Sequence, residues 1–278
     1  MRVVEVLNIL DKKISPTVKW RNDPSGLLVG DREAEVKAIL TALNPTLEVA
    51  KEAKKKGCNL IVSHHPLFKK PVTGLVEGEY YSDIIRFLIK NEISLISCHT
   101  NYDLMSEGVS CLLAEAIGLK NIKPLVPVSV LDELENYPPD DKSDDYGLGS
   151  IGDLKNKMSL KEFCAVVSDK LGTDTLRVAA KDIKIKIGKV AVCGGSGAES
   201  WKYAYKAGAD VFLTSEFNHH LYQQASYYIC VVDATHHATE KFSTDGLYKS
   251  LIKSIGKTLR IVKSEKDTDI VRSLKELK

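Results

Sequence analysis

The chain of 278 residues is 44% hydrophobic and 27% charged, which is typical of a folded globular protein and excludes a disordered or fibrous one. Its 39 basic and 37 acidic residues leave a formal charge of only +2, so the overall charge gives no electrostatic reason to bind nucleic acid or a membrane. The seven histidines form three adjacent pairs and one single residue: His64 and His65, His99, His219 and His220, His236 and His237. Scattered surface histidines would not cluster in this way, so the question is what these clusters hold.

The first segment, residues 1–13, carries Val3, Val6 and Leu10 at helical spacing and predicts an amphipathic helix. It has neither the uninterrupted apolar core nor the small-residue cleavage site of a signal peptide. No apolar run approaches the roughly 20 residues that a helix needs to span a bilayer. The six cysteines lie in apolar segments without a CxxC pair, which is typical of buried free thiols in a reducing compartment. We therefore expect a cytoplasmic protein.

Two segments, 36–63 and 187–214, align without a gap at an offset of 151 residues. Each predicts a buried strand, a helix and a second buried strand, and the apolar runs favour largely parallel strands that are covered on both faces. Five identical residues in 28 could arise by chance, but the shared strand–helix–strand pattern favours an internal duplication. The sequence therefore predicts an α/β fold built from two similar halves.

The helix of each copy has its own boundary signals. Asn44 is the expected N-cap in the first copy, while Ser196 and Glu199 match a capping box in the second. Gly57 and Gly208 suit the left-handed position that follows the last helical turn. Both helices are therefore expected to begin at polar caps and to end at glycine.

Between the two halves, residues 132–145 hold seven carboxylates and two prolines and predict a solvated loop. An amphipathic helix is expected near 159–171. Residues 259–263 predict a last strand, which could lie at a sheet edge. These elements put the repeat halves at approximately 1–123 and 187–278, joined by a connecting segment, 124–186.

Both halves end on an apolar strand followed by a histidine and, four residues later, a carboxylate. These residues are His99 and Asp103 in the first half, and His236 and Glu240 in the second. The pair that begins at His64 follows another buried strand. Polar groups at the carboxyl ends of buried strands occupy the place where open α/β sheets bind ligands.

Imidazole nitrogen and carboxylate oxygen form the donor set that zinc, iron, manganese and nickel favour. His236 and Glu240 share one face of a helix and can reach a single centre. His64 and His65 diverge at a strand end, which suits two neighbouring metals. With Asp103, these five donors leave coordination positions open for water, which is typical of a catalytic site.

Each candidate also has an ordinary structural explanation. A single histidine after a strand, such as His99, is more often a hydrogen-bonded residue than a ligand, and His220 and His237 could be the outward members of their pairs. Asp103 could cap a helix, and Glu240 could be a solvated helix residue. These explanations are less satisfactory together, because the five metal-binding candidates lie at strand ends in both halves of a repeat.

The glycine-rich stretch 194–197 opens a helix after a strand, so its backbone N–H groups could cradle an anion. It lacks the Walker lysine and the dinucleotide-binding fingerprint. A tight turn that lets helix and sheet pack closely is the preferred interpretation.

Five motifs follow one another along the chain: Asp23-Pro-Ser-Gly26-Leu-Leu-Val-Gly30, Ser63-His-His-Pro66, His99-Thr-Asn-Tyr-Asp103, Gly194-Gly-Ser-Gly197 and Asp233-Ala-Thr-His-His-Ala-Thr-Glu240. This ordered set resembles the NIF-three-like family, often described as GTP cyclohydrolase 1 type 2 homologues, from the N-terminal helix to about residue 265. The resemblance implies one NIF-three-like domain over 1–278, with two similar, intertwined α/β halves, mixed and mostly parallel sheets, and flanking helices. It also implies a toroidal assembly, commonly a homohexamer.

The resemblance implies a dinuclear centre with two divalent metal ions per subunit, of which Zn, Fe or Mn are expected. Its ligands map onto His64, His65, Asp103, His236 and Glu240, with Glu240 as the expected bridge. The candidates for proton transfer, or for orienting the ligands, are Glu216, His99, His219 and His220.

The chain departs from the family pattern at two places. Ser150 ends a Gly-Leu-Gly-Ser stretch where many relatives carry Gly-x-Gly-Arg, so any contact of that arginine with a substrate anion is absent. Ser215 and Glu216 stand where relatives carry Gly-Asp, so the carboxylate is one methylene longer and the glycine is lost. These departures bear on substrate preference rather than on the metal ligands.

The sequence thus predicts a dinuclear metal-dependent hydrolase, GTP cyclohydrolase 1 type 2-like, that acts on a nucleotide or related small molecule through a metal-activated water. The alternative is a non-catalytic metal-binding toroidal scaffold or regulatory protein that acts through protein partners. We expect a homo-oligomer and neither a membrane nor a nucleic-acid partner.

Overall fold

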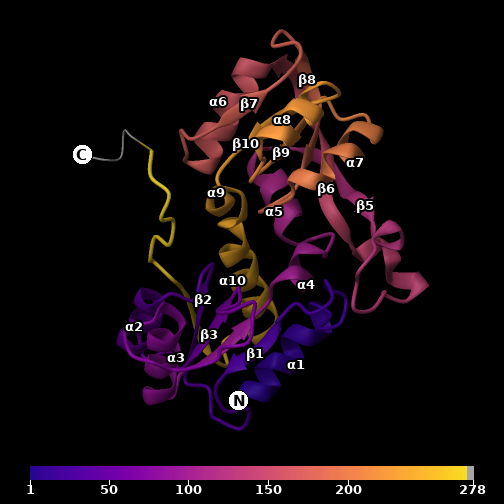
Figure 1. The fold of residues 1–278 in the computed structure, drawn as a ribbon. Helices are drawn as coiled ribbons and strands as arrows, with labels where there is room; N and C mark the ends of the chain where they lie inside the picture. The colour runs from indigo at the N-terminus through magenta and orange to yellow at the C-terminus, as the bar shows by residue number, and fades with distance from the viewer. Residues whose placement is uncertain (274–278) are drawn as a thin grey trace. The chain divides into compact units, whose positions relative to one another are not determined.

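The structure of the protein, a computed structural model, describes residues 1–273. Within them the chain forms two compact units, each built on its own β-sheet (Figure 1). The first unit comprises residues 1–102, 133–137 and 243–268, and the second comprises 103–132, 138–242 and the described residues from 269 onward. The chain thus passes repeatedly from one unit to the other, as expected for intertwined halves. The repeat boundaries at 1–123, 124–186 and 187–278 stay a prediction, and residues 274–278 of that range lie outside the described part.

The first unit contains a five-stranded sheet in the order β1-β4-β3-β2-β11. Its strands are β1 (Gly26–Val29), β2 (Ala38–Ala42), β3 (Leu60–Ser63), β4 (Ser94–Ser97) and β11 (Arg260–Lys263). Only β1 is antiparallel to its neighbour, and every residue of β2, β3 and β4 is buried, as the apolar runs predict. The last strand of the chain, β11, lies at the sheet edge.

The helices of this unit are α1 (Val3–Lys13), α2 (Leu47–Lys55), α3 (Tyr80–Lys90), the short α4 (Thr100–Asp103) and α10 (Phe242–Ile255), of which α4 and α10 each continue by one residue into the second unit. The predicted amphipathic helix α1 buries Val3, Val6 and Leu10. Helices α2 and α3 contact each other and share a core with alternate strand residues such as Leu40 and Ile61. Figure 1 draws α2 and α3 on one side of this sheet and α1 on the other.

The second unit contains a six-stranded sheet in the order β5-β6-β8-β9-β10-β7. Its strands are β5 (Lys120–Pro127), β6 (Gly147–Ser159), β7 (Arg177–Ala179), β8 (Lys186–Val192), β9 (Val211–Thr214) and β10 (Cys230–Asp233). Strands β8, β9 and β10 are parallel, whereas β5, β6 and β7 pair antiparallel. The first sheet is therefore mostly parallel, as predicted, and the second is mixed.

The helices of the second unit are α5 (Val109–Ala116), α6 (Leu160–Leu171), α7 (Trp201–Lys206), α8 (His219–Ser226) and α9 (His236–Glu240). Helix α6 matches the helix predicted near 159–171 and begins at a capping box between Ser159 and Glu162. Its Phe163 packs into a core with Val190 and Leu213 of the sheet. The acidic segment 132–145 is a loop, as predicted, with a short 3-10 turn (Asp140–Asp145) and an isolated bridge from Leu134 to Trp20.

The two sheets share the pairing register that the sequence repeat predicts. In the first sheet Ile39 pairs with Leu60, and in the second Val190 pairs with Val211, each of which lies 151 residues later. A third parallel strand follows in both cases, β4 or β10, and each has an antiparallel strand on its far side, β1 or β7. The common order and register support an internal duplication.

The start of α2 differs from the prediction. Its N-cap is Thr46, whose hydroxyl accepts a hydrogen bond from the Val49 N–H at 3.3 Å. Asn44 does not cap the helix, because its side-chain oxygen accepts a hydrogen bond from the His65 ring. The helix ends as predicted, with Gly57 at a φ of 65°.

The start of α7 differs as well. A 3-10 turn (Ala198–Ser200) precedes the helix, so Ser196 and Glu199 do not form a capping box. The Ser196 hydroxyl instead donates a hydrogen bond to Glu216. Gly208 follows the helix at a φ of 73°, which confirms its predicted role.

Among the described residues, no helix combines the length and apolar character needed to cross a membrane. All six cysteines are free thiols, in agreement with the sequence.

Candidate metal centre

In the first unit the histidine pair lies directly after β3. The Nδ1–H of His64 donates to the Cys98 carbonyl oxygen at 2.9 Å, and that of His65 donates to the Asn44 side-chain oxygen at 2.6 Å. Each ring is thus held through Nδ1, which leaves the Nε2 lone pair as the ligand position, the usual arrangement of metal-binding histidines. The two histidines offer ring nitrogens that lie within 4.8 Å of one another.

The backbone around this pair is fixed by β-sheet contacts. The N–H groups of His64 and His65 donate to the carbonyls of Ala42 and Leu43, at 3.1 and 2.9 Å. The Ser97 hydroxyl donates to the His64 carbonyl at 2.9 Å. These bonds place the pair at the carboxyl end of the first sheet, where α/β proteins bind ligands.

His99 follows β4 in the same unit, and its ring centroid lies 5.5 Å from that of His64 and 5.7 Å from that of His65. Its Nδ1–H donates to Asp23 at 2.5 Å. Burial raises the pKa of Asp23, but hydrogen bonds from His99 and Ser25 outweigh burial and hold that pKa below its ordinary value. The aspartate is therefore a carboxylate that orients the third imidazole of the first unit.

In the second unit α9 carries two candidates four residues apart on one face. The His236 ring lies between two carboxylates, with Nδ1 2.6 Å from Glu216 Oε1 and Nε2 2.9 Å from Glu240 Oε2. Burial lowers the pKa of His236, but Glu240 and Glu216 raise it to about 9. The Thr235 hydroxyl accepts from the Ala238 N–H at 3.2 Å and caps this short helix.

Gly195 makes room for this arrangement. Its φ is 65°, and a Cβ atom at this position would collide with Glu240 Oε1 and come within 3.2 Å of the His236 ring. The glycine-rich stretch is thus a tight turn, as preferred from the sequence, and it packs directly against the candidate ligands. The Ser215 hydroxyl donates to the Gly195 carbonyl at 2.7 Å, so the serine that departs from the family pattern helps to hold the turn.

Asp103 is the last residue of α4 and the first residue of the second unit. Burial, then the negative charge of Asp103, then that of Glu240 raise the pKa of the Cys193 thiol to about 12. The two carboxylates therefore act on the same buried thiol at the end of β8.

Within each unit the structure brings predicted residues together. His64, His65 and His99 lie together in the first unit, and Glu216, His236 and Glu240 lie together in the second. His219 and His220 begin α8 with exposed side chains, and their roles stay predictions.

The sequence prediction missed the residues that support the candidate ligands: Asp23, Asn44, Gly195 and Ser196. Asn44 lies two residues after the end of β2, so the signal of a polar residue near a strand end could have identified it. Asp23 opens the first of the five motifs but carries no structural signal of its own.

A family model described as Duf34/NIF3 (NGG1p interacting factor 3) matches residues 1–270. The chain is 34% identical over 244 residues to a GTP cyclohydrolase 1 type 2 homolog of Streptomyces coelicolor, which covers 86% of this chain and 81% of the relative. A protein of the same description from Clostridium acetobutylicum is 34% identical over 245 residues, with 86% and 85% covered. The crystal structure of Staphylococcus aureus protein SA1388 is similar at a TM-score of 0.88 and 30% identity, with 99% of both chains covered.

Proposed function

The chain belongs to the Duf34/NIF3 family, and on that premise we propose that it is a hydrolase that uses two divalent metal ions. The residues that would hold the metal ions are His64, His65, Asp103, His236 and Glu240. The observation that carries the proposal is that both adjacent histidines are anchored through a hydrogen bond from Nδ1, which makes Nε2 the nitrogen of each ring that would bind a metal.

The donor chemistry fits a borderline divalent metal such as Zn, Fe or Mn. His64, His65 and Glu240 are of the residue types that could hold a metal ion. The close approach of Gly195 to Glu240 supports the same assignment. The side chain of any larger residue at position 195 would collide with the Glu240 carboxylate.

When bound, metal ions at such a centre supply a hydroxide at neutral pH and polarise the bond that is cleaved. The residues of the chain then have separate tasks. Asn44 and the Cys98 carbonyl orient the histidine pair, and Glu216 holds Nδ1 of His236. His99, oriented by Asp23, is the group of the first unit that can accept or donate a proton.

The substrate class is a nucleotide or a related small molecule. The relatives' description as GTP cyclohydrolase 1 type 2 homologs supports GTP as the first compound to test. Because a serine stands at position 150, where the family resemblance puts an arginine, an anionic substrate would depend on the metal ions for its attraction.

One observation favours a second candidate function, a metal-binding scaffold without turnover. Ser150 is buried in β6, so its side chain offers a substrate anion no accessible substitute for the arginine. Such a protein would retain the metal ligands and act through protein partners.

The test is metal analysis of the purified protein, followed by an activity screen of the metal-loaded protein on GTP, other nucleotides and phosphoesters. We expect two equivalents of metal and turnover of at least one compound. The double variant His64→Ala with Glu240→Ala should lose both, whereas His237→Ala, a matched loss of an imidazole from α9, should retain the metal. Two equivalents of metal without turnover would favour the scaffold, and no bound metal in the unmodified protein would contradict both functions.

A further inference from the structure

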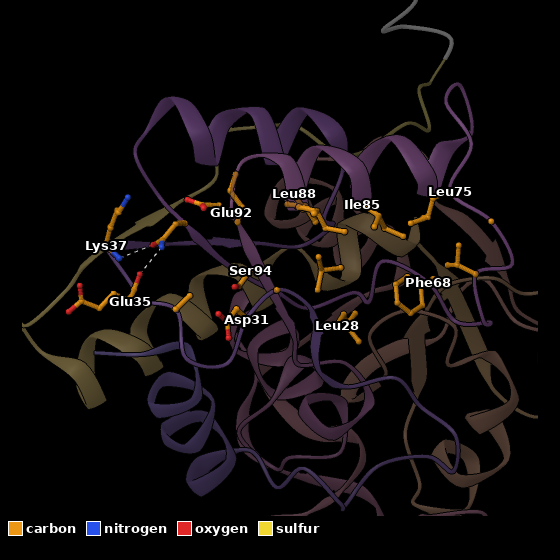
Figure 2. Close-up of a pocket in the computed structure, with 18 of the residues that line it drawn as sticks. Leu28, Asp31, Glu35, Lys37, Phe68, Leu75, Ile85, Leu88, Glu92 and Ser94 are labelled. Carbon is orange, nitrogen blue, oxygen red and sulfur yellow. Dashed lines mark hydrogen bonds between the residues drawn. The ribbon is translucent and has the colours of Figure 1, made fainter.

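A cavity of about 950 Å³ lies in the first unit, within the range of small-molecule sites (Figure 2). It is formed by β1 and the segment between β1 and β2, by α3, by the loop after β3 and by the turn that leads into β4. Asn59 precedes β3 and Ser94 opens β4, so one end of the cavity is at the amino ends of these strands. The histidine pair lies at the opposite, carboxyl end of β3. The length of the strand therefore separates the pair from the part of the cavity that Asn59 and Ser94 line.

One side of the cavity is apolar. Figure 2 shows Leu28, Phe68, Leu75 and Ile85 grouped there, with Leu88 of α3 above the centre. Leu75 is 49% exposed and Ile89, which also lines the cavity, is 59% exposed. Apolar side chains that are exposed beside a cavity gain from covering by a ligand of matching character.

The other side is polar and carries an excess of negative charge. Figure 2 shows Asp31, Glu35, Lys37 and Glu92 at this side. The polar side thus carries three carboxylates and one ammonium group, and within residues 1–273 no ion pair joins Lys37 to any of the three.

The polar side has a fixed backbone. The Asn59 side-chain oxygen accepts a hydrogen bond from the Lys37 N–H at 2.7 Å, and its NH₂ group donates to the Glu35 carbonyl at 2.7 Å. The amide is therefore fully engaged in holding residues 35 and 37, so the carboxylates rather than Asn59 define the chemistry on offer to a ligand.

We propose that this cavity binds a small molecule with an apolar body and one protonated amine. The apolar body would lie against Leu28, Phe68 and Ile85, and the amine would lie on the polar side, towards Glu92. A carboxylate ligand of the same size would meet like charges, and a neutral one would forgo the attraction. The proposal does not depend on the metal centre, whose ligands lie outside the cavity lining.

Octylamine is the probe, with octanoate and octanol as its anionic and neutral counterparts and ethylamine as the amine without an apolar body. Isothermal titration calorimetry should give saturable binding of octylamine, weaker binding of the other three, and a loss of affinity as salt rises. Glu92→Gln should weaken octylamine about twofold to fivefold, the effect of one partly exposed charge, and Glu35→Gln should weaken it less. Ile89→Ala should weaken octylamine and octanol alike, and Glu115→Gln, an exposed carboxylate of the second unit, should change neither.

Four results would overturn the proposal. The first three are octylamine binding weaker than about 1 mM, equal binding of octanoate, and an affinity that the two glutamine variants leave unchanged. Self-association that Ile89→Ala abolishes, without octylamine binding, would also overturn it and assign the cavity to a second copy of the chain.

Discussion

Single residues next to the candidate ligands determine how those ligands are oriented. Asn44 and Gly195 are the clearest examples, since one accepts a hydrogen bond from His65 and the other leaves space for Glu240. Neither residue is itself a proposed ligand. Substitution at these positions can therefore separate the support of the ligands from their chemistry.

Asn44→Ala removes the acceptor for the Nδ1–H of His65. We expect metal affinity to fall about 10-fold to 100-fold, because partners behind a ligating histidine fix its orientation and its basicity. Competition titration with a chromogenic chelator measures the affinity. Asn8→Ala, on the exposed side of α1, is the control and should bind metal normally. An Asn44→Ala protein that also binds metal normally would show that the hydrogen bond is dispensable.

Gly195→Ala and Gly208→Ala separate backbone strain from contact with the candidate ligand. Both glycines have a positive φ, so each alanine carries a left-handed cost of about 1 kcal/mol. Only at Gly195 does the new Cβ meet Glu240, because nothing lies within 4 Å at Gly208. We expect both variants to lose stability in urea unfolding and Gly195→Ala alone to lose metal. Equal metal content in the two variants would contradict the role assigned to Gly195.

At the scale of secondary-structure elements, Glu52 joins α2 to the segment that follows β11. Its carboxylate accepts hydrogen bonds from the Ser264 hydroxyl at 2.5 Å and the Glu265 N–H at 2.9 Å, and it lies 2.8 Å from Lys56 Nζ. Burial raises the pKa of Glu52, but the hydrogen bonds from Lys56, Ser264 and Glu265 outweigh the effect of burial. The pKa of Glu52 therefore lies below its ordinary value of 4.5.

Glu52→Gln tests this junction. A depressed folded-state pKa stabilises the protein above the unfolded-state value near 4.5, and this stabilisation is lost as pH falls through the folded-state value. We expect the variant to lose about 1–3 kcal/mol of unfolding free energy at pH 7. The difference from the unmodified protein should shrink in acid. Urea unfolding at several pH values measures it, with Glu48→Gln on the exposed face of α2 as control. A difference that does not vary with pH would contradict the ionic role of Glu52.

Elements with a local cause were predictable from the sequence. Strands β2, β3, β8 and β9 follow from continuous apolar runs, and α6 follows from its periodicity. The starts of α2 and α7 were not predictable, because the residues expected to cap them form hydrogen bonds with residues that are distant in the sequence. The side chain of Asn44 is hydrogen-bonded to His65, 21 residues away, and that of Ser196 is hydrogen-bonded to Glu216, 20 residues away.

The same reason limits what could be predicted of the candidate site. The four-residue spacing of His236 and Glu240 was sufficient to place them on one helical face. The pairing of His99 with Asp23 spans 76 residues and depends on the packing of β1 against β4. No local pattern encodes such a contact.

At the scale of the whole molecule, bound metal should stabilise the folded chain. A ligand that binds only the folded state at 100 times its dissociation constant adds about 2.7 kcal/mol. We expect a chelator to lower the midpoint of thermal unfolding and added metal to restore it. The double variant His64→Ala with Glu240→Ala should respond to neither treatment. An unmodified protein whose midpoint ignores the chelator would argue against a folded-state metal site.

We also propose that the chain assembles into a toroidal homohexamer, as the family resemblance implies. Light scattering coupled to gel filtration should then give a mass of about six times 30.7 kDa. The mass should be independent of protein concentration across the micromolar range. A strict monomer would rule out the toroid and would leave the metal-site proposal standing.

The late position of β11 in the chain has a consequence for biosynthesis. Strand β2 has an open edge until residues 260–263 pair with it, and by then residues 103–242 have already left the ribosome. Domains of nascent chains commonly fold from the N-terminus onward. Here the order differs. The sheet of the second unit can complete its strand pairing first, and the sheet of the first unit, with its histidine pair, is completed last.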